Sequence, residues 1–174
     1  MNHQEIKQLI DDKFGSVIEH IKAQDPTEFT KVYKPEKWSN GQHLDHLRKA
    51  TRAFNEGLTL PKLALRLKFG KHRGEKRTYE QITSDYKRLV KTIKAPASVV
   101  PDPLTNEDKA RVLDWFAQEQ RALKKGLTRF TEKQLSSYQL PHPVLGKLSI
   151  RELSYWCVMH TEHHYELMKR DNAQ

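Results

Sequence analysis

Apolar residues recur along most of this chain every three or four positions, which is the spacing of amphipathic helices. In the first such stretch, Ile6, Leu9, Ile10, Phe14 and Val17 fall on one helical stripe. The pattern predicts four long helices, over 4–21, from Ser39 to about Gly57, over 107–129 and over 149–170, and a shorter one over 78–93.

Two of the predicted helix starts carry a capping box. Ser39 is followed three residues later by Gln42, and Ser149 by Glu152. In this motif the two side chains bond each other's backbone N–H groups and so fix the first turn. Trp38, just before the first cap, is placed to pack against His43 or a neighbour of it.

The connections between these helices differ in composition. Residues 62–77 are strongly basic and contain Gly70 and Gly74, so part of this stretch is expected to be a loop. Residues 95–103 hold three prolines and predict an extended connection, and 131–147 reads as irregular, without convincing strand alternation. The 61–103 connection is too long for a hairpin, so we expect an all-α, antiparallel-type four-helix bundle with one long crossover and an extra short helix.

Length and composition limit the classes of protein that remain. A chain of 174 residues fits one domain, here taken as 1–174. Its single cysteine, Cys157, excludes an intrachain disulfide and a zinc-finger ligand set. No apolar leader is visible, and the apolar run 155–159 is far too short for a bilayer, so we expect a cytoplasmic protein without a membrane partner.

The net charge of +9 would attract anions or nucleic acid without sequence preference. A solvated surface that keeps the protein soluble explains the same charge. The basic stretch 62–77 likewise allows two interpretations. It is either a solvated loop or a segment that attracts the carboxylates or phosphates of a substrate.

Candidate chemistry comes from the nine histidines. His160 and His164 are four residues apart and therefore share a helix face, which is also the apolar face of the last helix. His46 lies on the inner stripe of the second predicted helix. Three neutral imidazoles with one open position are typical of a catalytic metal site. The alternative is a hydrogen-bonded histidine pair in the core, and imidazole ligands alone do not select the metal.

The sequence gives weaker evidence that other reactive side chains belong to the candidate site. His163 is rotated about 100° from its neighbour His164. His43 is a residue either behind the metal ligands or at the edge of the core, and His142 lies in a Pro-His-Pro loop, which can border a pocket at the end of a bundle. Cys157 is expected to pack in the core rather than act as a nucleophile.

The combined pattern resembles a known family over nearly the whole chain. Trp38-Ser39-x-x-Gln42-x-x-x-His46-Leu47 is similar to the opening of the second helix in DinB/YfiT-like proteins, and His160-x-x-x-His164 is similar to their last-helix motif. The resemblance implies a bundle of up-down-down-up topology and a divalent metal, usually nickel or zinc, held by His46, His160 and His164. Some members of that family transfer low-molecular-weight thiols of the bacillithiol, mycothiol or glutathione type, and the family also includes an isomerase.

We therefore expect a metal-dependent enzyme that acts on a small molecule, either a thiol S-transferase or a hydrolase. A metal-binding bundle without catalysis is the alternative, and a nucleic-acid-binding protein is the weakest reading because no groove-reading or base-stacking motif is present. Bundles of this kind often form homodimers, but the sequence shows no exposed apolar stripe that requires one.

Overall fold

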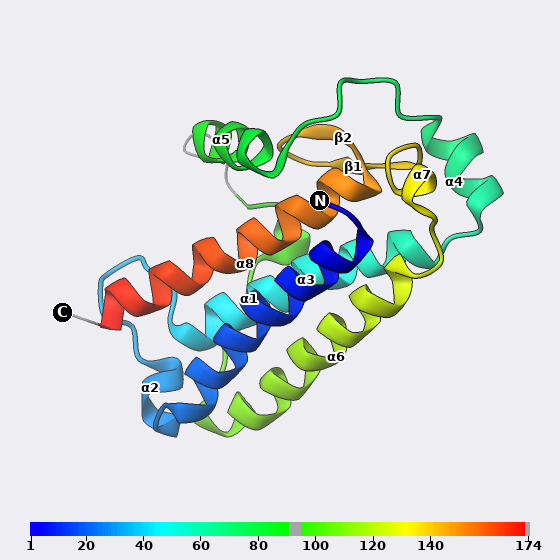
Figure 1. The fold of residues 1–174 in the computed structure, drawn as a ribbon. Coiled ribbons are helices and arrows are strands. Elements are labelled where there is room, and N and C mark those ends of the chain that lie inside the picture. The colour runs from blue at the N-terminus through cyan, green and yellow to red at the C-terminus, as the bar shows by residue number, and fades with distance from the viewer. Residues whose placement is uncertain (91–94, 173–174) are drawn as a thin grey trace.

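A computed structural model describes residues 1–90 and 95–172. Four long helices form a bundle: α1 (His3–Ala23), α3 (Asn40–Thr59), α6 (Lys109–Leu127) and α8 (Ile150–Asn172). Figure 1 shows that α1 and α8 run in one direction and that α3 and α6 run in the other. The expected four-helix bundle with up-down-down-up topology is confirmed.

The predicted apolar stripes form the core between these helices. On α1, Ile6, Ile10, Phe14 and Val17 are almost completely inaccessible to solvent. Phe14 stacks on Phe116 of α6 with ring centroids 4.9 Å apart and planes at 5°. Burial of such rings and branched side chains is the main free-energy gain that holds the bundle together.

Both predicted capping boxes are present. The Gln42 N–H donates to the Ser39 hydroxyl, and the Gln42 side chain accepts from the Ser39 N–H. Ser149 and Glu152 make the same reciprocal pair at the start of α8. These local bonds fix where the two histidine-bearing helices begin, and thus the register of their histidines.

The chain between the long helices contains more regular structure than the sequence pattern predicts. A short helix, α2 (Pro26–Thr30), follows α1. The chain between α3 and α6 holds α4 (Lys62–Phe69), α5 (Tyr79–Leu89) and the 3-10 turns η2 (Ala97–Val99) and η3 (Asn106–Asp108). The basic stretch is thus helical in its first half, where only Leu65 is buried. Of the helix predicted over 78–93, residues 91–93 lie outside the described residues.

The prediction that 131–147 is irregular was wrong. It contains the helical turn α7 (Glu132–Leu135) and strand β1 (Gln139–His142), which pairs antiparallel with β2 (Gly146–Ser149). In β1, Leu140 and His142 are buried and Pro141 is exposed. The alternation covers only these three residues, and its outward position is a proline, which normally indicates a break.

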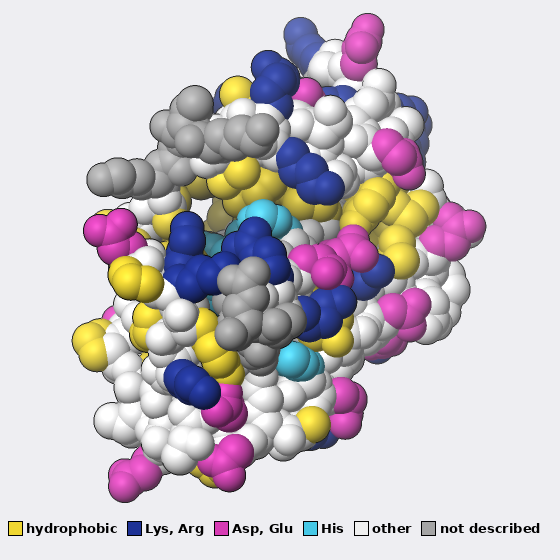
Figure 2. All heavy atoms as spheres, turned by 90° about the vertical axis from the view of Figure 1, so that its left-hand side faces the viewer, with side chains coloured by type: hydrophobic (Ala, Val, Ile, Leu, Met, Phe, Trp, Pro, Cys, Tyr) yellow, Lys and Arg dark blue, Asp and Glu magenta, His cyan; other side chains and the backbone are white. Residues whose placement is uncertain are grey.

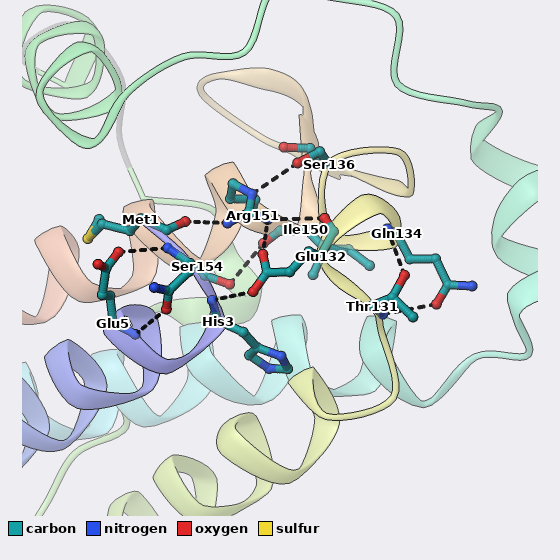
Figure 3. A network of polar contacts seen from close by, with 12 residues as sticks. Met1, His3, Glu5, Thr131, Glu132, Gln134, Ser136, Ile150, Arg151 and Ser154 are labelled. Atoms are coloured by element: carbon teal, nitrogen blue, oxygen red, sulfur yellow. Dashed lines mark hydrogen bonds and ion pairs between the residues drawn. The ribbon is translucent and has the colours of Figure 1, made fainter.

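A polar network ties the N-terminus to the hairpin end of the bundle (Figure 3). Arg151, in the first turn of α8, donates to the Ser136 hydroxyl and the Met1 carbonyl and pairs with the Glu132 carboxylate. The backbone N–H of His3 donates to the same carboxylate at 2.6 Å. The network joins α1, α7 and α8 at one end of the bundle.

Among the described residues, no helix combines the length and the apolar character needed to cross a lipid bilayer.

Candidate metal centre

The structure brings the three predicted histidines together. His46 comes from the second turn of α3, and His160 and His164 come from successive turns of α8. The Nε2 atom of His160 lies 3.2 Å from Nε2 of His46 and 3.1 Å from Nε2 of His164. One nitrogen of each ring lies within 4.8 Å of the other two, and all three residues are buried.

Two of the three rings have a polar contact at Nδ1, on the side away from the cluster. Nδ1 of His46 is 2.8 Å from the carbonyl oxygen of Val99 in η2. A carbonyl only accepts, so Nδ1 of neutral His46 carries the proton and Nε2 presents a lone pair. Nδ1 of His164 is likewise 2.8 Å from Nδ1 of His43, one of the two nitrogens donating to the other. His43 therefore lies behind the cluster rather than in it.

The cluster is held in its neutral form. Burial lowers the pKa of His46, although the bond to Val99 offsets part of this effect. Burial, and next the proximity of other histidines, holds the pKa of His160 and of His164 well below its ordinary value. Neutral imidazole is the form that ligates metals.

The donor set fits a divalent cation. Zinc–nitrogen bonds of about 2.1 Å in a tetrahedron place two ligand nitrogens about 3.4 Å apart, close to the two separations between these Nε2 atoms. Without a cation, Nε2 of His160 carries at most one proton, yet it faces both the lone pair of His46 Nε2 and Nε2 of His164. Buried acceptors left in this way are costly, so the arrangement favours a shared cation.

The cluster borders a cavity of about 540 Å³, within the usual range for small-molecule sites. Its other walls are mostly apolar and come from α3, α5, α8, the crossover and the β1–β2 hairpin. Figure 2 shows a histidine side chain inside a hollow of the surface that hydrophobic side chains border. Lys and Arg side chains lie beside this hollow in the same view.

Aromatic rings pack around the histidines. Trp38 lies 4.9 Å from His46 between ring centroids and 5.6 Å from His43, as its position before the cap predicts. Trp156 stacks on His160 at 4.7 Å, and Tyr86 meets the same ring edge-on at 5.8 Å. The sequence pattern identifies Trp156 as a core residue but does not predict that it lines the site.

The remaining reactive residues are placed as follows. His142 lies in β1, not in a loop, and lines the cavity. Burial lowers its pKa to about 4. Cys157 is buried against Thr51, and burial raises its pKa to about 12, so it packs as predicted and is a poor nucleophile. His163 lines the cavity beside His164 but is not one of the clustered residues.

Two expectations about other segments change. Among the described residues of 62–77, only Phe69 lines the cavity, so the basic side chains of that stretch do not reach it. The sequence favours a core position for Trp115 as an aromatic residue, but Trp115 is partly exposed on α6, where Arg48 and Arg111 lie over its ring at 5.0 and 4.5 Å.

Comparison with known proteins identifies the family of this chain. No curated protein and no solved structure matches the sequence significantly. A family model, that of the DinB superfamily, matches residues 10–168, which include α3, most of α8 and all three clustered histidines. Because the match spans nearly the whole bundle, this chain belongs to the DinB superfamily.

Proposed function

We propose that this protein is a metal-dependent enzyme that acts on a small molecule, with His46, His160 and His164 as the ligands of a nickel or zinc ion. The proposal depends on one observation above all. Three buried, neutral imidazoles turn their Nε2 atoms toward one another at the edge of a cavity large enough for a substrate.

The chain's own residues have distinct parts in this proposal. His46, His160 and His164 hold the ion, while the Val99 carbonyl and His43 orient two of the rings through Nδ1. The apolar walls limit the access of water to the site. When bound, such an ion supplies a Lewis acid that makes water or a thiol nucleophilic near neutral pH.

The reaction is either thiol S-transfer or hydrolysis. A thiol of the glutathione type carries carboxylates, and the described lining of the cavity contains no cationic side chain to pair with them. His163 lines the cavity, and burial lowers its pKa. The positive charges of Lys87 and Arg170 lower this pKa further, so both cations lie near this edge of the cavity. The carboxylates of a thiol would therefore bind at this edge, with the sulfur directed inward.

The metal site is tested by elemental analysis of untagged protein and by zinc titration. His46→Ala, His160→Ala and His164→Ala are each expected to lose the ion while circular dichroism shows an intact helical fold. His163→Ala is the matched control and should retain it. Retention of a stoichiometric ion in all three cluster variants would exclude the proposed ligand set.

The reaction is tested on the metal-loaded protein. Conjugation of monochlorobimane to bacillithiol, mycothiol or glutathione reports thiol transfer, and release of p-nitrophenol from p-nitrophenyl acetate reports hydrolysis. Activity that disappears in His160→Ala supports the proposal. A stoichiometric metal with neither activity would favour a metal-binding bundle without catalysis.

A further inference from the structure

One wall of the cavity carries a hydrogen-bond donor that the described chain does not satisfy. The indole Nε1 of Trp156 is buried and makes no hydrogen bond of acceptable geometry to the described residues, although it lies close enough to the Tyr86 hydroxyl to offset part of the rise in the Tyr86 pKa that burial causes. The residue is only 7% exposed and lines the cavity. A buried donor without an acceptor costs about 1–3 kcal/mol, so such groups normally have a partner.

Two further donors flank this indole. The ring of Trp156 lies 4.4 Å from that of His142 and 6.2 Å from that of Tyr86, between centroids. Nδ1 of His142 accepts from the backbone N–H groups of Val144 and Leu145, so the proton of the neutral ring is on Nε2. Tyr86 contributes a hydroxyl, and all three side chains line the same cavity.

The described part of this wall is uncharged. Among the described residues that line the cavity there is no Lys, Arg, Asp or Glu. A carboxylate bound against these rings would lose its hydration without gaining a countercharge, which is unfavourable in an apolar site. A neutral oxygen needs only hydrogen-bond donors, and this wall supplies them.

We propose that Tyr86, His142 and Trp156 form a subsite for an uncharged carbonyl oxygen, and that the substrate is a neutral, mainly apolar molecule carrying that group. Because Trp156 stacks on His160, a carbonyl held there lies beside the histidine cluster. The inference names the substrate class of the proposed enzyme and rests on that proposed function for its catalytic meaning. The binding preference itself follows from the cavity wall.

The test compares three probes of similar shape by nitrogen–proton NMR of the zinc-loaded protein. Acetophenone has a neutral carbonyl, ethylbenzene has no oxygen, and benzenesulfonate carries a charge but ligates zinc poorly. We expect acetophenone to bind at least about fivefold more tightly than ethylbenzene, as one or two hydrogen bonds provide. It should also move the Trp156 indole proton resonance downfield, and benzenesulfonate should bind more weakly than either.

Matched variants locate the effect. Trp156→Phe removes the indole donor and Tyr86→Phe only the hydroxyl, and each is expected to lower the preference for acetophenone over ethylbenzene about two- to tenfold. Trp115→Phe, on the outer surface of α6, is the control and should leave the preference unchanged. If Trp156→Phe does not fold, the preference measured in Tyr86→Phe, compared with that of the parent protein, still tests the subsite.

Two results would overturn this inference. One is equal binding of acetophenone and ethylbenzene, which would mean that water satisfies the indole. The other is tighter binding of benzenesulfonate than of acetophenone. Failure of the proposed metal-dependent function is distinguishable from failure of this inference. Zinc titration detects the former, and the probe preference can then still be measured on the protein without added zinc.

Discussion

At the scale of single residues, contacts on the far side of a ring decide what the ring can do. His46 and His164 have the same side chain as His163, but only the first two have an Nδ1 contact that turns Nε2 toward a common point. Sequence spacing identified the ligand candidates, because residues four apart share a helix face. It left the role of His43 open, because the approach of α3 to α8 sets that contact.

His43→Phe tests this outer contact. The variant fills the same space but removes the partner of His164 Nδ1, so the ring loses part of its orientation. We expect zinc affinity to fall about 10- to 100-fold, the usual effect of losing an outer partner of a metal-binding histidine. Competition with a fluorescent chelator measures it, and His20→Phe on α1 is the control. Affinity within twofold of the parent protein would mean that His43 has no such role.

His142 makes stability depend on pH. Burial lowers its pKa from 6.5 to about 4 in the folded protein. Between these values the unfolded chain binds a proton that the folded chain does not, so the free energy of unfolding falls as pH falls from 6.5 to 4. The full loss in the free energy of unfolding that this one histidine causes is about 3 kcal/mol.

His142→Asn isolates this contribution. The Asn oxygen can accept from the Val144 and Leu145 N–H groups as Nδ1 does, but it does not titrate. Urea unfolding at pH 6.5 and at pH 4.5 should show a smaller loss of stability in the variant than in the parent protein. Equal losses would show that His142 titrates normally in the folded state.

At the scale of secondary structure, close approaches between elements decide which glycines matter. An alanine Cβ at Gly41, in the first turn of α3, would lie 2.8 Å from ring carbons of Phe29 and 2.9 Å from its carbonyl oxygen. A backbone atom cannot move aside as a flexible side chain can. At Gly15, in the middle of α1, the same Cβ meets nothing within 4 Å.

These two glycines form a matched pair. Gly41→Ala is expected to destabilise the protein by about 1–3 kcal/mol, because α2 and α3 must separate. Gly15→Ala should stabilise it by up to about 1 kcal/mol through helix propensity. Thermal and urea unfolding measure both. If both substitutions stabilise the protein, the close packing of Phe29 on α3 is not present.

Elements differ in how far their own residues determine them. The starts of α3 and α8 could be predicted because each capping box is a four-residue motif with local chemistry. The β1–β2 hairpin could not, since each strand is four residues long and is stabilised by its partner and by Leu140 packing over Gly57 of α3. The hairpin also places His142 at the cavity. Because the hairpin was not predicted, this part of the site was not predicted either.

At the scale of the whole molecule, the candidate site joins distant parts of the chain. His46 precedes the long crossover, and His160 and His164 lie near the C-terminal end, so their meeting depends on the bundle topology. The joint motif was enough to predict that topology and those three residues. The wall of Tyr86, His142 and Trp156 was not predicted, because it comes from three segments that have no common sequence pattern.

A metal held by both α3 and α8 must also stabilise the bundle, because the unfolded chain does not hold the three histidines together. Zinc at 100 times its dissociation constant adds about 2.7 kcal/mol of stability. In a protein of this size that is a rise of about 5–10 °C in melting temperature, and a chelator should reverse it. His160→Ala should show no rise, whereas His163→Ala should respond like the parent protein. An equal rise in His160→Ala would place the stabilising ion elsewhere and separate stability from the three-histidine cluster.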